Sequence, residues 1–172
     1  MWYTAAMKKR ETIKKAWSWL FISAFVIAID QITKQLVVHF ISDQTGTIDV
    51  LPFLNIILTT NSGASFGFLD QASGWHVYFL VLVSLFISFI LIRWLVHLPK
   101  TAWQTALPVS LVLGGALGNL IDRVHYGLVI DFIDFHLGDW HYATFNIADA
   151  AVCVGVIWLV AGLFYESVIS KS

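Results

Sequence analysis

Four long apolar stretches dominate the chain. They run from about residue 17 to 38, 75 to 98, 105 to 121 and 148 to 169. A helix rises about 1.5 Å per residue and the hydrocarbon core of a bilayer is about 30 Å thick, so about 20 mostly apolar residues cross it. The pattern therefore predicts an all-α membrane protein with four transmembrane helices. Because short loops join the spans and no internal repeat is visible, we expect residues 1–172 to form one domain.

The segment between the first two spans has a different pattern. Residues 48–60 are rich in β-branched and aromatic side chains and contain Pro52. This composition is typical of one or two short strands. The segment is too apolar for a free loop, so we expect a small β-like element that lies on the membrane surface or covers a cleft.

The composition supports a membrane protein. Hydrophobic residues make up 58% of the chain and charged residues 12%, whereas a soluble domain carries about a quarter charged residues. This argues against a water-soluble enzyme and a disordered chain, and the net charge of −1 argues against a nucleic-acid binder. The single cysteine, Cys153, excludes an internal disulfide and a cysteine-based zinc site.

The distribution of charge predicts the orientation. Eight of the ten Lys and Arg residues lie in the N-terminal tail, in the turn between the second and third spans, or at the C-terminus. Four spans place these segments on one side, and the positive-inside rule makes that side cytoplasmic. The two outer loops, about 39–74 and 122–147, and the adjoining helix ends hold nine of the eleven acidic residues. Polar chemistry is therefore expected at the extracytoplasmic face.

Two polar features lie in or near the first span. Asp30 and Lys34 are four residues apart and share a helix face, which is typical of an intrahelical ion pair, although direct contact with a substrate is the alternative. The polar turn from Asn61 to Phe66 contains Gly63, which can adopt backbone angles that other residues avoid. It is either a simple turn or a loop whose amides, or whose Asn61, hold a peptide backbone.

The third span combines small residues with a polar end. Gly114 and Gly118 have the spacing that allows close helix approach. Asn119, Asp122 and Arg123 then end the span. They are either boundary charges or a hydrogen-bonding frame for a site.

Three of the carboxylates that follow stand out. Asp131 and Asp134 lie among Ile, Val and Phe, where burial is expected to raise a carboxyl pKa. A helix would place both on one face and a strand would place them on opposite sides, and the pattern leaves both open. Asp149 opens the fourth span three residues after Asn146, which suits a helix cap.

The sequence contains few motifs for metal binding or nucleophilic catalysis. His125, His136 and His141 lie near several aspartates, but no metal-ligand spacing such as HExxH is present, so we expect no metal and no cofactor. No Ser-His-Asp pattern stands out. Two adjacent carboxylates cannot both ionise easily, and such a pair can activate water as in aspartic proteases. A proton- or ion-coupled transporter and a membrane assembly factor are the alternatives from other classes.

Five blocks together resemble the bacterial prolipoprotein signal peptidases, the signal peptidase II family. In order along the chain they are Asp30-Gln31-Ile32-Thr33-Lys34, Asn61-Ser62-Gly63-Ala64-Ser65-Phe66, Gly114-Gly115-Ala116-Leu117-Gly118-Asn119-Leu120-Ile121-Asp122-Arg123, Val129-Ile130-Asp131-Phe132 and Phe145-Asn146-Ile147-Ala148-Asp149. Each block is weak alone, but five in the family's order are specific.

The resemblance implies a membrane aspartyl endopeptidase that cleaves prolipoproteins before a diacylglyceryl-modified cysteine. By motif position, Asp131 and Asp149 are implied as the catalytic pair. Substrate-binding or supporting roles are implied for Asp30, Lys34, Asn61, Gly63, Asn119, Asp122, Arg123 and Asn146. The expected partners are lipidated prolipoproteins and membrane lipid, not nucleic acid. We expect a monomer in the bacterial inner membrane, with cytoplasmic termini and an extracytoplasmic active site.

Overall fold

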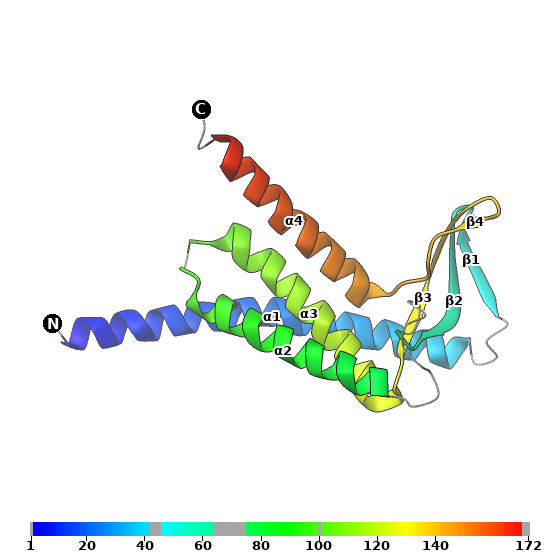
Figure 1. Ribbon diagram of the computed structural model, residues 1–172, viewed down its shortest axis with the longest axis horizontal. Coiled ribbons are helices and arrows are strands. Elements are labelled where there is room, and N and C mark those ends of the chain that lie inside the picture. The colour runs from blue at the N-terminus through cyan, green and yellow to red at the C-terminus, as the bar shows by residue number, and fades with distance from the viewer. Residues whose placement is uncertain (1, 42–45, 64–74, 100, 170–172) are drawn as a thin grey trace.

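Four helices and a small sheet make up the computed structural model, which describes residues 2–41, 46–63, 75–99 and 101–169. The helices are α1 (Trp2–Phe40), α2 (Trp75–His97), α3 (Trp103–Tyr126) and α4 (Ile147–Ile169). The strands are β1 (Thr47–Leu51), β2 (Leu54–Asn61), β3 (Val129–Leu137) and β4 (Trp140–His141). Figure 1 shows the sheet at one end of the helices, with both termini and the α2–α3 turn toward the other end.

The four predicted spans are confirmed. Membrane-competent segments run over Ser18–Phe40, Trp75–His97, Trp103–Tyr126 and Ile147–Tyr165. Large apolar side chains such as Phe21 and Phe86 point outward, where lipid rather than water can cover them. The protein is therefore a multi-pass membrane protein with an all-α membrane part.

Two helix boundaries differ from the predicted spans. Helix α1 begins at Trp2, well before residue 17, and α3 continues to Tyr126, beyond residue 121. Gly127 ends α3 with a φ of 72° and donates its N–H to the Arg123 carbonyl. Hydropathy marks where a segment is apolar, but backbone hydrogen bonding continues the helix until a residue such as glycine ends it.

Helix α3 packs closely against its neighbours. A Cβ on Gly114 would lie 2.7 Å from the Val26 Cβ of α1, and a Cβ on Gly118 would lie 2.8 Å from Asp30 Oδ2. Both separations are too short for a side chain, so the predicted close approach at residues 114 and 118 is confirmed. As a result, the polar face of α1 around Asp30 lies directly against α3.

The sheet confirms the predicted strands and decides the conformation around Asp131. Its order is β1-β2-β3-β4, and every pairing is antiparallel. The predicted segment 48–60 falls within β1 and β2 and the turn between them. Asp131 and Asp134 lie on the extended strand β3 and so point to opposite sides. Phe132 packs with Val37 and Ile41 at the end of α1, which attaches the sheet to the helices. Within the turn predicted at residues 61–66, Ala64, Ser65 and Phe66 lie outside the described residues.

Candidate active site

Asp131 lies on β3 with 2% of its surface exposed. Asn146 Nδ2 donates a hydrogen bond to Asp131 Oδ1 at 2.7 Å. Burial and the nearby charge of Asp149 raise the pKa of Asp131 to about 6, while hydrogen bonds from Asn61 and Asn146 partly offset that rise. The raised pKa expected from the apolar surroundings is therefore confirmed for Asp131.

Asp149 lies in the first turn of α4 and takes part in its N-terminal cap. The Asp149 N–H donates to Asn146 Oδ1 at 2.8 Å, and the Asn146 N–H donates to Asp149 Oδ2 at 3.3 Å. This reciprocal pair has the geometry of a capping box. The capping interpretation is confirmed, and it leaves Asp149 Oδ1 free of the cap.

Two carboxamides connect the aspartates. Asn119 Nδ2 donates to Asp149 Oδ1 at 2.7 Å, and Asn146 Nδ2 donates to both Asn119 Oδ1, at 3.1 Å, and Asp131. Residues from α3, β3 and the start of α4 therefore form one polar cluster. The two aspartates share this cluster although they lie on different elements, and Asp149 is close enough to affect the pKa of Asp131.

Asn61 reaches the same cluster from the end of β2. Its side chain is a hydrogen-bonding partner of Asp131. Its Oδ1 accepts the Gly63 N–H at 2.8 Å, and Gly63 has a φ of 75°, a conformation that favours glycine. This turn occupies the oxygen of Asn61, so its Nδ2 is the atom available to donate to a carboxylate.

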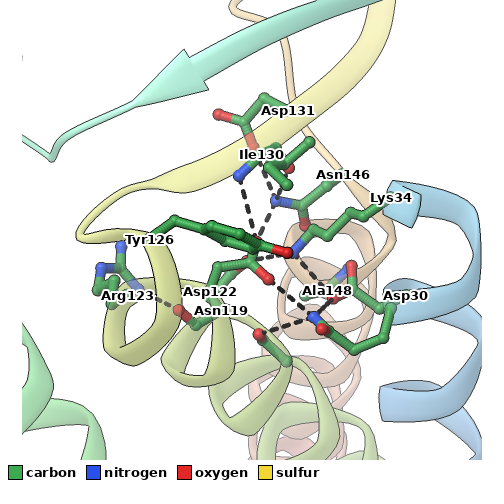
Figure 2. Close-up of polar contacts among 12 residues, drawn as sticks. Asp30, Lys34, Asn119, Asp122, Arg123, Tyr126, Ile130, Asp131, Asn146 and Ala148 are labelled. Atoms are coloured by element: carbon green, nitrogen blue, oxygen red, sulfur yellow. Dashed lines mark hydrogen bonds and ion pairs between the residues drawn. The ribbon is translucent and has the colours of Figure 1, made fainter. Parts of the chain in front are cut away.

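A buried ion cluster of Asp30, Lys34 and Asp122 adjoins the polar cluster at Asn119. Lys34 Nζ lies 2.8 Å from Asp30 Oδ2 and 2.8 Å from Asp122 Oδ2, and both lysine and Asp30 side chains are 0% exposed. The predicted intrahelical pair is confirmed, but Lys34 also crosses to α3 (Figure 2). Gln31 belongs to the first sequence block but was assigned no role from it, and its side chain donates to Asp122 Oδ1 at 2.8 Å. Its polarity within an apolar span, three residues before Lys34, was the signal that could have identified it.

A cavity of about 590 Å³ opens beside Asp149. Asn119 and Arg123 of α3, Asp149 and Cys153 of α4, and Ser84 of α2 contribute to its walls, together with residues 142–145. The described lining includes Asp149 but not Asp131. Arg123 lies within electrostatic reach of both aspartates, so the cavity has a charged end at the cluster and a more apolar end along α4.

Asp134 lies apart from this cluster. Asn55 Nδ2 donates to Asp134 Oδ2 at 3.3 Å, and His141 Nδ1 lies 2.9 Å from Asp134 Oδ1.

The described residues contain no group of three or more His, Cys, Asp or Glu side chains arranged to hold a metal ion. Asp131 is buried and Asp149 is partly buried, and both lie among carboxamides and within electrostatic reach of Arg123. Two carboxylates in such surroundings can hold a shared proton and polarise a water molecule.

Comparison with known proteins identifies related sequences and structures. A family model described as signal peptidase (SPase) II matches residues 22–165. A lipoprotein signal peptidase of Coxiella burnetii (strain Dugway 5J108-111) is 48% identical over 147 residues, covering 86% of this chain and 90% of the relative. A second, of Shewanella loihica (strain ATCC BAA-1088 / PV-4), is 43% identical over 148 residues, covering 86% and 85%. A bacterial membrane enzyme structure determined in meso at 1.9 Å is 32% identical, with a TM-score of 0.75 over 85% of this chain and 92% of the other.

Proposed function

The chain belongs to the signal peptidase II family of aspartic peptidases, and from that premise we propose that it removes signal peptides from prolipoproteins with Asp131 and Asp149 as the catalytic pair. The cleaved bond precedes the diacylglyceryl-modified cysteine. The observation that carries this proposal is the hydrogen-bonded connection from Asp131 through Asn146 and Asn119 to Asp149. It supports two carboxylates acting on one water molecule.

The environments of Asp131 and Asp149 favour different protonation states for the two carboxyl groups. Asp131 is buried with a pKa raised to about 6, so it is the better holder of the shared proton. Asp149 accepts hydrogen bonds from the Asn119 amide and the Asn146 N–H at the N-terminus of α4, where the helix dipole stabilises negative charge. We therefore assign the proton to Asp131 and the negative charge to Asp149.

The reaction then follows from this assignment. Asp149 accepts a proton from a bound water, whose oxygen attacks the scissile carbonyl carbon. Protonated Asp131 donates a hydrogen bond to the carbonyl oxygen and stabilises the tetrahedral intermediate. When the carbon–nitrogen bond breaks, the cysteine nitrogen receives a proton from the pair. The signal peptide leaves with a new carboxylate, and the lipidated cysteine becomes the new N-terminus.

The membrane explains why the site lies at the end of the helices. Diacylglyceryl chains hold the cysteine at the level of the lipid, so the scissile bond reaches the site near the membrane surface. We place this end at the extracytoplasmic face of the bacterial inner membrane, with both termini cytoplasmic. The cavity between Ser84 of α2 and Cys153 of α4 offers a lateral route for lipid. We propose a single-domain monomer.

The test is a cleavage assay. Detergent-purified protein is incubated with a lipidated prolipoprotein, and mass spectrometry should detect a loss equal to the mass of the signal peptide. The same precursor without the diacylglyceryl group is the matched substrate control and should remain intact. Asp131→Asn and Asp149→Asn should fold and insert but not cleave. Turnover by either variant at the wild-type rate would exclude the proposed pair.

A further inference from the structure

Lys34 occupies the centre of a fully buried cluster that the proposed reaction does not use directly. Its ammonium group contacts three described acceptors: Asp30 Oδ2 at 2.8 Å, Asp122 Oδ2 at 2.8 Å and Asn119 Oδ1 at 3.0 Å. An ammonium group has three N–H donors, so these contacts account for all of them. Figure 2 shows Lys34 extending from α1 toward Asn119 and Asp122 of α3.

Each carboxylate of this cluster also accepts a hydrogen bond from a backbone N–H next to a proposed catalytic aspartate. Asp30 Oδ1 accepts the Ala148 N–H at 2.9 Å, and Ala148 directly precedes Asp149. Asp122 Oδ2 accepts the Ile130 N–H at 3.2 Å, and Ile130 directly precedes Asp131. The same arrangement therefore occurs twice, once at the start of α4 and once on β3, and Lys34 joins the two.

The third contact of Lys34 determines how Asn119 is oriented. A lysine ammonium group can only donate, so the Asn119 atom facing Lys34 must be its oxygen. Asn119 Nδ2 is therefore directed at Asp149 Oδ1. A flipped amide would place an oxygen against that carboxylate, and the connection between the two aspartates would be lost.

An ordinary intrahelical ion pair does not account for this geometry. Asp30 and Lys34 lie one turn apart on α1 and neutralise each other within that helix. Contacts with Asp122 and Asn119 on a second helix are not needed for that purpose. They do, however, fix α1, α3, β3 and the start of α4 relative to one another.

We propose that Lys34, with Asp30 and Asp122, is a positioning device that sets the separation and orientation of Asp131 and Asp149. This inference rests on the proposed function, because it assigns the two aspartates to the reaction. Lys34 itself touches neither substrate nor water in this scheme. It acts through the backbone amides of Ala148 and Ile130 and through the Asn119 side chain.

The test compares Lys34→Met, which removes the charge, with Lys34→Arg, which keeps it, in the lipidated prolipoprotein assay. Lys34→Met should lower kcat by about 100-fold, the effect of misplacing reacting groups by about 1 Å, with KM within about threefold of wild type. Lys34 lowers the pKa of Asp131, so Lys34→Met should move the high-pH limb of kcat/KM to higher pH. Lys34→Arg should lower kcat but leave that limb in place. Gln35→Ala, at the exposed neighbouring position, is the matched control and should behave as wild type.

The outcomes separate this proposal from the proposed function. A folded Lys34→Met variant with kcat within about threefold of wild type, or with lower kcat and an unmoved pH limb, would overturn the positioning role. If Lys34→Met does not fold, Lys34→Arg and Asp30→Asn provide the test instead. A lower kcat at unchanged KM in both variants supports the proposal. A wild-type kcat in both variants overturns it. Cleavage by Asp149→Asn would instead overturn the catalytic pair.

Discussion

The side chain of Asn146 donates to Asp131 Oδ1 at 2.7 Å, while its own oxygen accepts the N–H of Asp149. One residue thus caps α4 and binds both proposed catalytic aspartates. The two roles use different atoms, since the cap needs the oxygen and the link to Asp131 needs the nitrogen. They can therefore be separated by substitution.

Replacing Asn146 with serine and with alanine should separate the cap from catalysis. Serine is also a good N-cap, so Asn146→Ser should be about 1 kcal/mol more stable than Asn146→Ala, while both lose the hydrogen bonds that Asn146 Nδ2 donates. Neither variant has the amide nitrogen that binds Asp131, so both should lose about 100-fold in kcat. Thermal melts and the cleavage assay measure the two effects. Near-wild-type turnover by Asn146→Ser would show that the amide link is dispensable.

The pH dependence of cleavage should reflect Asp131. Burial and the charge of Asp149 raise its pKa to about 6, and the pair requires one proton. That proton is lost as the pH rises through the pKa of Asp131. We therefore expect kcat/KM of the free enzyme to fall along a limb that begins near pH 6. A rate profile that stays level through this region would contradict the assignment of the proton.

Asp131 should also reduce stability at neutral pH. An unfolded aspartate titrates near 3.9, and folded Asp131 near 6. Between these values the folded state binds more protons, so the free energy of unfolding falls as the pH rises through that window. Asp131→Asn should therefore be more stable than wild type above about pH 6, on the order of 1–2 kcal/mol, and similar below about pH 4.

Thermal unfolding in detergent at both pH values checks that prediction. Asp49→Asn, at an exposed position on β1, is the matched control and should change little. Equal stability of Asp131→Asn and wild type at neutral pH would mean that the buried carboxylate carries no cost.

Cys153 offers a chemical test of the cavity. It is the single cysteine, its side chain is exposed, and it lines the cavity one helical turn after Asp149. A bulky maleimide on Cys153 should obstruct the cavity and lower the cleavage rate by about tenfold or more. Cys153→Ala should cleave normally and resist the reagent. Full activity of stoichiometrically labelled protein would place substrate elsewhere.

Gly118→Ala should disturb the buried ion cluster through packing. The added Cβ would lie 2.8 Å from Asp30 Oδ2 and 3.3 Å from the Ala148 Cβ. We expect the variant to lose about 1–3 kcal/mol of stability, with a lower kcat because Asp30 must shift. Gly162→Ala on α4 is the control, since no described atom lies within 4 Å of its added Cβ. An equally active and stable Gly118→Ala variant would contradict the close packing.

Local features of this protein were readable from the residues alone. Hydropathy identified the four spans because a membrane helix must be apolar over its own length. Spacing identified the Asp30–Lys34 pair and the Asn146–Asp149 cap, because both depend only on residues within one helical turn. Helix ends were less accurate, as α3 shows, because Gly127 rather than a change in hydropathy ends it.

Relationships between distant segments required the tertiary structure. The pattern around Asp131 fitted a helix or a strand, and pairing with β2 makes it a strand. Asp134 therefore lies on the opposite side of the strand from Asp131, where it contacts His141. Likewise, Lys34 could be paired with Asp30 by spacing, but its contacts with Asp122 and Asn119 exist only because α3 packs against α1. Short-range order follows from neighbours along the chain, whereas the meeting of α1, α3, β3 and α4 depends on how whole elements pack, and no local pattern encodes that.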